Sequence, residues 1–182
     1  MNFEISALNV NGTKKALEKR ELLDQVLSRL TPEVAAVLTD PYSAKWHDGN
    51  ALLAIWQAVR ALRGLEAVET LNHEIVRDSL GPVLGPVLKM ATLLAGASPA
   101  TLFSRLDQLA SAGSRGSTHT WAKESDTSGT LTIRYPSPQP LELMEAIWRG
   151  IFRVTRDRLG RPVSIDSVTD APGHAFVFRI RW

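Results

Sequence analysis

The end of the chain carries the pattern that most limits its fold. Two sets of side chains alternate there, Phe176, Phe178, Ile180 and Trp182 in one set and Val177, Arg179 and Arg181 in the other. Successive side chains of a strand point to opposite faces, so the alternation predicts a β-strand with one face in the core. Such a strand needs hydrogen-bonded partners and a layer that covers its apolar face.

The partners are expected shortly before it. The pattern alternates over 117–121 and again over 131–135, and a turn signal lies between the two segments at 126–129. Helical spacing then returns over 144–154, and Val163, Ile165 and Val168 suggest a third strand. The predicted class is therefore α+β, an N-terminal helical bundle followed by a four-stranded antiparallel sheet of β-β-α-β-β order. We expect one domain over 1–182.

Helix boundaries before this sheet follow from caps and breakers. Thr13, Thr31 and Asp48 are each predicted to cap a helix, and Gly64 is predicted to end one. Another helix is expected over 66–80. The segment 80–94 is apolar on nearly all sides, which is typical of a buried helix. A further helix is expected from Ser98-Pro99 to about Ala112-Gly113.

Composition narrows the class of protein. The chain has 182 residues, no cysteine and a formal net charge of +2. Without cysteine there is no disulfide, zinc–thiolate site or thiol nucleophile, which suits a cytoplasmic protein. The low net charge gives no support to nucleic-acid binding. The first residues do not resemble a signal peptide, and the longest apolar tract, 80–97, is too interrupted for a membrane span.

Catalytic motifs are missing from the sequence. None of the histidines, His47, His73, His119 and His174, has the partner spacing of a metalloprotease helix, and no nucleophile elbow or phosphate-binding loop is present. His73 and Glu74 are expected on a helix surface, and His119 is expected half-buried beside Trp121. The run 114–117 is either an anion-binding loop or, more simply, a loop that enters a strand. We therefore expect neither an enzyme nor a metal site.

A resemblance follows from the segment 131–150, which contains Tyr135-Pro-Ser137-Pro-Gln139. It resembles the haem nitric-oxide/oxygen-binding (H-NOX) domains, whose Tyr-x-Ser-x-Arg motif grips the haem propionates. By fold, the same superfamily includes vinyl-reductase-type and TRAPP-like domains. The closer match is to an uncharacterised bacterial paralogous family of that superfamily, on the segments 44–46, 80–81 and 114–116. The resemblance is clearest from Leu80 to Trp182.

Two departures from the H-NOX pattern shape the functional expectation. Gln139 stands where haem binders carry arginine, and a neutral amide lacks the charge-assisted grip of a guanidinium. Haem binders also need a proximal histidine on the helix before the sheet, but 83–109 contains none. The sequence therefore predicts a ligand-sensing or protein-interaction domain, regulatory or scaffolding, without a cofactor. The alternative is a sensor of an apolar small molecule or haem in a cavity near Tyr135.

Candidate binding residues follow from these expectations. The ligand-binding candidates are Tyr135, Ser137, Gln139 and Trp148. The partner-binding candidates are Arg149, Arg153 and Arg156, which share a helical face, although a solvated helix face is the simpler explanation given the low net charge. A homodimer or another protein partner is expected, because the N-terminal helices offer more apolar surface than one sheet covers.

Overall fold

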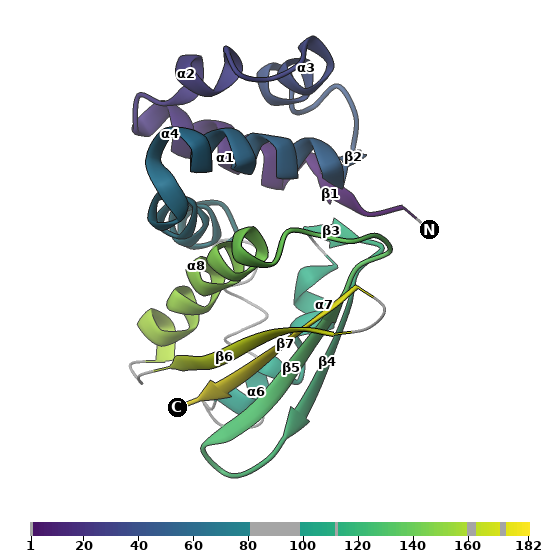
Figure 1. The fold of residues 1–182 in the computed structure, drawn as a ribbon, viewed down its shortest axis with the longest axis vertical. Coiled ribbons are helices and arrows are strands. Elements are labelled where there is room, and N and C mark those ends of the chain that lie inside the picture. The colour runs from purple at the N-terminus through teal and green to yellow at the C-terminus, as the bar shows by residue number, and fades with distance from the viewer. Residues whose placement is uncertain (1, 81–98, 112, 160–162, 172–173) are drawn as a thin grey trace.

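The computed structural model describes every residue except 1, 81–98, 112, 160–162 and 172–173. Helices form one end of the molecule and an antiparallel sheet forms the other (Figure 1). The helical end contains α1 (Ala7–Lys19), α2 (Leu23–Leu27), α3 (Pro32–Thr39), α4 (Gly49–Ile75) and a π-helical turn, η1 (Val76–Leu80). The expected segregation of helices from strands is therefore confirmed.

Side-chain caps explain the starts of α1, α3 and α4. The Thr31 side chain accepts a hydrogen bond from the Val34 N–H and Asp48 accepts one from the Asn50 N–H, so both predicted caps are confirmed. The predicted cap at Thr13 is wrong. Ser6 caps α1 instead, and the buried Thr13 hydroxyl donates to the Asn9 carbonyl at 3.0 Å from inside the helix.

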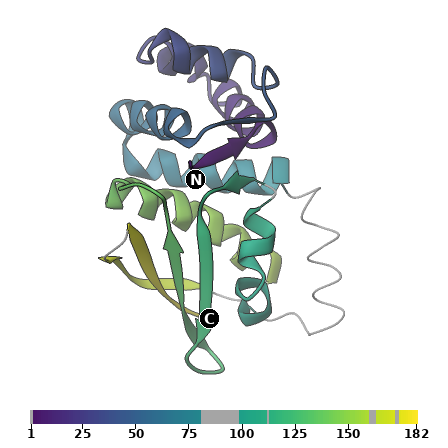
Figure 2. The ribbon, with the colours of Figure 1, turned by 90° about the vertical axis from the view of Figure 1, so that its right-hand side faces the viewer.

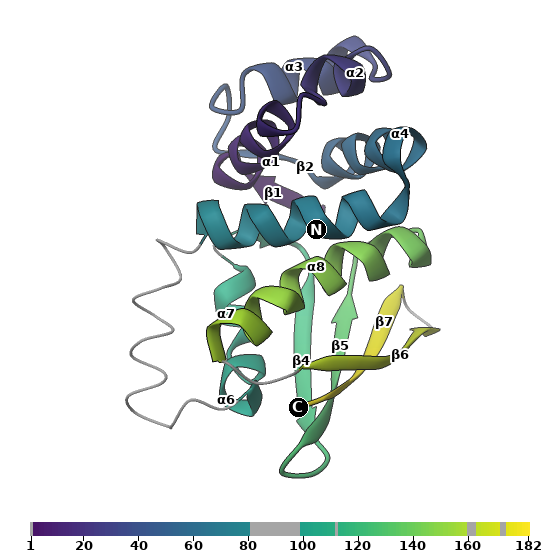
Figure 3. The same ribbon diagram turned by 90° about the vertical axis from the view of Figure 1, so that its left-hand side faces the viewer.

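Gly64 bends the long helix α4 into two arms. Its φ of 79° lies in the left-handed region, which glycine adopts without a Cβ penalty. The first arm packs among α1 to α3, and the second runs between them and the sheet (Figure 3). The two helices expected before and after Gly64 are thus found as the two arms of one bent helix.

A small sheet that the sequence did not predict ties the two ends of the molecule together. It consists of β1 (Glu4–Ser6), β2 (Trp46–Asp48) and β3 (Ser114–Arg115) in the order β2-β1-β3. Each strand is too short to show a period, so the pairing was not visible in the sequence. A Cβ at Gly116 would collide with the Asn2 carbonyl oxygen, so this glycine allows the N-terminal segment to lie close.

The main sheet is antiparallel throughout. Its order is β4-β5-β7-β6, from β4 (Thr118–Lys123), β5 (Ser128–Arg134), β6 (Ser164–Ala171) and β7 (Ala175–Arg181). The long helix α8 (Leu141–Leu159) lies between β5 and β6 in the chain, which confirms the β-β-α-β-β order. The alternation that opens the sequence argument is confirmed, since Phe176, Phe178 and Ile180 are buried.

The long helix α8 and a pair of short helices cover the same face of this sheet. Phe103 of α6 (Pro99–Phe103) contacts Trp121 of β4 and Phe152 of α8, and Phe152 contacts Phe178 of β7. Figure 2 shows α6 and α7 (Leu106–Ala110) beside β4. The single helix predicted from Ser98 is therefore replaced, among the described residues, by two short helices. The predicted helix over 80–94 lies outside the described residues, apart from Leu80.

The second arm of α4 and α8 meet at a close crossing. A Cβ at Gly150 would collide with the Glu69 carbonyl oxygen, so the two backbones approach more closely than an alanine would allow. Arg153 pairs with Glu69 across the crossing at 3.4 Å, and His73 pairs with Asp157 at 2.7 Å. This crossing is the main packed contact between the helical end and the sheet end.

No described helix is both long enough and apolar enough to cross a membrane.

Candidate functional site

The site begins at Tyr135, immediately after β5. Its side chain is buried, and its hydroxyl accepts a hydrogen bond from Trp148 Nε1 of α8 at 3.1 Å. Phe3 meets the Tyr135 ring edge-on at 5.1 Å between ring centroids. Burial raises the pKa of the Tyr135 hydroxyl well above its usual value, so the hydroxyl stays protonated. The structure therefore brings together two of the predicted ligand residues, Tyr135 and Trp148, and bonds them to each other.

His119 continues this contact toward the surface. It stands on the covered face of β4, and its ring meets Trp148 edge-on at 5.5 Å. Its Nδ1 lies 3.1 Å from Asp107 Oδ1 of α7, and the His119 backbone N–H donates to the same oxygen at 3.0 Å. Because an ionised carboxylate only accepts, Nδ1 carries the proton.

Burial decides the charge of His119. The His119 side chain is 2% exposed whereas that of Asp107 is 65% exposed. Burial lowers the pKa of His119, and it outweighs the hydrogen bond and charge of Asp107, which act in the opposite direction. At neutral pH the pair is therefore a neutral imidazole held by an anionic carboxylate, with a net charge of one negative unit.

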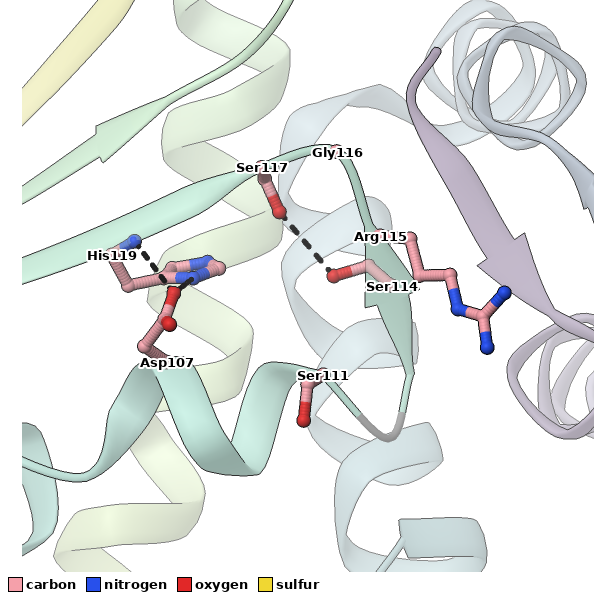
Figure 4. A pocket seen from close by; sticks show the side chains of 7 residues that line it. All are labelled: Asp107, Ser111, Ser114, Arg115, Gly116, Ser117 and His119. Atoms are coloured by element: carbon pink, nitrogen blue, oxygen red, sulfur yellow. Dashed lines mark hydrogen bonds and ion pairs between the residues drawn. The ribbon is translucent and has the colours of Figure 1, made fainter. Parts of the chain in front are cut away.

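A pocket of about 340 Å³ opens beside this pair. We call it the α7–β4 pocket. Its lining, drawn in Figure 4, consists of Asp107, Ser111, Ser114, Arg115, Gly116, Ser117 and His119. The volume lies at the lower end of the range of small-molecule sites, roughly 300–1,000 Å³. Hydroxyl, imidazole and carboxylate groups meet here, which suits a small polar ligand.

The Arg115 side chain extends away from the other side chains that line the α7–β4 pocket. Its guanidinium lies over the Trp46 ring at 3.8 Å from the ring centroid. Figure 4 shows Asp107 and His119 on one side, Ser114 and Ser117 between, and Arg115 extending on the other side. The run 114–117 thus enters β4, as expected, and also lines a pocket, while anion binding by this run stays a prediction.

The other two predicted ligand residues lie in the loop between β5 and α8. The Gln139 amide donates to the Ser137 carbonyl at 3.2 Å and to the Ser137 hydroxyl at 3.1 Å. These bonds hold the loop in shape. Ser137 and Gln139 are half-buried and do not line the α7–β4 pocket.

The described residues at the haem-binding motif do not fit a haem. Gln139 offers no cation to a propionate, its amide is bonded to Ser137, and the Tyr135 hydroxyl is already bonded to Trp148. His73 and His119 each bond one ring nitrogen to an aspartate, and His47 bonds one to the Pro41 carbonyl, so the second nitrogen of each ring is outside these bonds. No group of three histidine, aspartate or glutamate side chains among the described residues could hold a metal ion.

The predicted partner-binding arginines lie along α8, each next to a carboxylate. Arg149 pairs with Glu145 at 2.6 Å, Arg153 with Glu69 at 3.4 Å and Arg156 with Asp157 at 3.3 Å. These partners offset much of the positive charge that the sequence suggested for this face.

The expectation that His73 and Glu74 lie on a helix surface is wrong. Both residues are buried, because α1 and α8 pack against the second arm of α4. His73 bonds to Asp157 of α8 and Glu74 to Arg20, which directly follows α1. His119, which was expected to be half-buried, is intermediate as a whole residue, but its side chain is buried.

Sequence reasoning missed Asp107 and Ser111 as site residues. Asp107 lies in a short helix, and its approach to His119 depends on how α7 packs against β4. A weak signal was present, since His119 shares a strand face with Trp121 and a buried imidazole requires a hydrogen-bond partner. The nearest preceding acidic residue in the chain is Asp107.

The fold is similar to that of solved H-NOX structures. The Fe(II) unliganded H-NOX protein from K. algicida gives a TM-score of 0.66 at 12% identity, covering 97% of this chain and 95% of that chain. An oxygen-binding H-NOX domain related to soluble guanylate cyclases gives 0.60 at 12% identity, covering 94% and 90%. An H-NOX variant of T. Tengcongensis gives 0.63 at 13% identity, covering 94% of each chain.

The chain therefore has an H-NOX-like fold, as the resemblance implied. At these identities the likeness concerns the fold alone. No protein-family model matches the chain, and no curated protein is similar to it in sequence.

Proposed function

We propose that this chain is a non-enzymatic ligand-sensing domain that works without haem and binds a small polar molecule in the α7–β4 pocket. The observation that carries the proposal is the pocket itself. It is an open site bordered by an aspartate and three serines, and its buried wall is His119. The H-NOX-like fold supports a sensing role by analogy only.

A sensor must change its structure when its ligand binds, and His119 offers the contact for this. Its ring touches Trp148, which bonds to Tyr135, and Tyr135 in turn contacts Phe3 near β1. A ligand that moved the Asp107–His119 pair would disturb a chain of packed side chains between the pocket and the small sheet. Occupancy would thus reach the region where the helical and sheet ends meet.

The test is a small-molecule screen read by amide chemical shifts of the full ¹⁵N-labelled chain. The expected result is that at least one polar compound moves the signals of Ser114, Ser117 and His119. A Ser117→Trp variant, which fills the pocket, should abolish those shifts. Thr120→Trp is the matched control, because Thr120 is an exposed residue of β4, the strand that begins directly after Ser117. Shifts that persist in Ser117→Trp would place the ligand elsewhere and contradict the proposal.

The proposal that the domain works without haem is tested separately. Purified protein is mixed with haemin, reduced, and examined for a Soret band. We expect no stable band, because Gln139 and the bonded Tyr135 hydroxyl offer a propionate no charge-assisted grip. A stoichiometric band with a coordinated iron would favour the alternative, a haem or apolar-ligand sensor near Tyr135.

The remaining proposals concern assembly and cell biology. We propose a single cytoplasmic domain with a regulatory or scaffolding role, which acts as a homodimer or with a protein partner at the face of Arg149, Arg153 and Arg156. Light scattering of the purified chain tests the homodimer, and a strict monomer at high concentration would contradict it. The relationship to vinyl-reductase-type and TRAPP-like domains stays a prediction.

A further inference from the structure

Strand β4 is an edge of the main sheet, and its backbone groups point in two directions. In an antiparallel pair, the N–H and C=O groups of one residue point to the partner strand, and those of the next residue point away from it. The Glu124 N–H bonds to the Ser128 carbonyl at 3.1 Å, and the register with β5 is continuous, so the even-numbered residues of β4 face β5. The groups that face outward belong to His119, Trp121 and Lys123.

A side chain already occupies one of these outward positions. The His119 N–H donates to Asp107 Oδ1 at 3.0 Å, which agrees with the alternation, and the His119 ring Nδ1 lies 3.1 Å from the same oxygen (Figure 4). Asp107 Oδ1 thus stands where the carbonyl oxygen of a further strand would stand. Because Asp107 belongs to the helix α7, it fills this position without extending the sheet.

The rest of the edge offers backbone groups to another strand. Outside the pairing with β5, the described residues include no backbone partner for Trp121 or Lys123. An unblocked edge of this kind is a template for a strand of another chain, and proteins commonly block such edges with a charged side chain or a covering helix. Asp107 on α7 combines both kinds of block.

The strand that matches this edge is β4 of a second copy. In an antiparallel pair centred on Trp121, the outward groups of one copy meet those of the other, because both strands turn their odd-numbered residues outward. Lys123 of each copy then lies opposite His119 of the other, which is neutral at pH 7. Like charges directly opposite would oppose pairing, and this register has none over 119–123.

We propose that Asp107 guards the β4 edge, and that its bond to the His119 N–H prevents β4 from pairing with β4 of a second copy. The inference goes beyond the proposed function, because it holds whether or not a molecule binds in the α7–β4 pocket. It also concerns a different surface from the α8 arginines that are proposed to bind a partner.

Amide hydrogen exchange of the ¹⁵N-labelled full chain at low concentration tests the guard. In the unmodified chain we expect the His119 N–H to be protected and the Trp121 and Lys123 N–H groups to exchange fast. Asp107→Ala should speed exchange at His119 at least about tenfold, the factor expected for a hydrogen bond to a charged acceptor. Asp107→Asn keeps an acceptor oxygen and should have a smaller effect. Trp121 and Lys123 amides as protected as that of Thr120 would show that the edge is covered and would overturn the proposal.

Sedimentation velocity over a range of concentrations tests the partner. We expect Asp107→Ala to self-associate at a concentration at least about tenfold lower than the unmodified chain, and Asp107→Asn to behave like the unmodified chain. Lys123→Pro removes an outward N–H and spares the amides bonded to β5, a position at which an edge strand tolerates proline. Combined with Asp107→Ala, it should therefore reverse the association. Circular dichroism confirms that each variant is folded.

The outcomes decide this inference separately from the proposed function. If Asp107→Ala associates no more readily than Asp107→Asn, Asp107 does not guard the edge. If the association persists with Lys123→Pro, it does not use β4, and the proposal is wrong. Both measurements are made without a ligand, so neither result changes the outcome of the small-molecule screen.

Discussion

Two histidine–aspartate pairs in this chain share their chemistry and differ in their surroundings. In each, a buried imidazole bonds to an aspartate that is much more exposed, His73 to Asp157 and His119 to Asp107. The first pair joins two long helices at a crossing so close that Gly150 can carry no side chain. The second joins a short helix to an edge strand and borders a pocket. The pair alone does not define a function; the space around it does.

The largest expected effect on stability comes from a substitution that pushes α4 and α8 apart where His73 pairs with Asp157. On helix propensity alone, Gly150→Ala would stabilise the chain by about 1 kcal/mol. The added Cβ meets the Glu69 carbonyl oxygen, however, so we expect a net loss of roughly 1–3 kcal/mol in the free energy of unfolding. Urea unfolding measures it. Gly113→Ala is the control, since its Cβ would meet only ordinary contacts. A neutral Gly150→Ala would mean that the crossing is not rigid.

The next effect tests the layer of residues behind the second pair. Tyr135→Phe removes the acceptor of the buried Trp148 Nε1–H group. A buried donor without a partner costs about 1–2 kcal/mol, and we expect that loss in unfolding free energy together with a change in tryptophan fluorescence. Tyr42→Phe, at an exposed tyrosine, is the control. An unchanged stability would show that Trp148 finds another acceptor.

Removing the carboxylate charge should affect the two pairs differently. Asp157→Asn weakens a bond that holds two helices together, so we expect a loss of about 1 kcal/mol, limited because Asp157 is partly exposed. Asp107→Asn keeps an oxygen that can accept both His119 bonds, so its cost in stability should stay below about 0.5 kcal/mol. Chemical unfolding of both variants decides this. Equal losses would contradict the contrast.

The smallest effect is a pH dependence that distinguishes the pairs. Burial lowers the folded-state pKa of His119 below its ordinary value of 6.5, so the folded state resists protonation. The stability linked to the neutral ring is therefore present above about pH 6.5 and is lost as the pH falls toward the lower, folded pKa. His119→Gln should flatten the unfolding profile in this window.

Asp157 contributes to the pH dependence of stability at a lower pH than His119 does. The hydrogen bond from His73 lowers the pKa of the Asp157 carboxyl below its ordinary value of 3.8. Its contribution is therefore present above about pH 3.8 and is lost only as the pH falls further. NMR titration of the His119 ring and unfolding curves from pH 3 to 8 test both statements. A His119 pKa above 6.5 would contradict the first.

The sequence predicted the elements that are long enough to show a hydrophobic period. The strands around Leu131 and Phe178 and the helix around Trp148 bury one face each, and hydrophobic burial on one face produces the period directly. Local hydrogen bonds made Thr31 and Asp48 predictable as caps. Thr13 failed because Ser6, another good cap, starts the helix earlier.

The rest depended on contacts between distant residues. His73 and Glu74 resemble a solvated helix face until α8 and Arg20 are placed against them. The ring of His119 could be assigned to a strand face, but its contact with Asp107 and the pocket beside this pair arise from the packing of a five-residue helix. Of the four predicted ligand residues, Tyr135 and Trp148 meet as a bonded pair, and Ser137 and Gln139 meet in a loop.

The small sheet has a consequence for the order in which the chain can be completed during synthesis. β1 is its central strand, and Glu4 pairs on one side with Asp48 and on the other with Arg115. A ribosome delivers the first partner early and the second much later, so β1 must wait with one edge open while most of the helical end emerges. Closing β3 onto it is a late step with a long loop to close. β1 therefore leaves the ribosome before both of its partner strands and is among the last elements to be fixed.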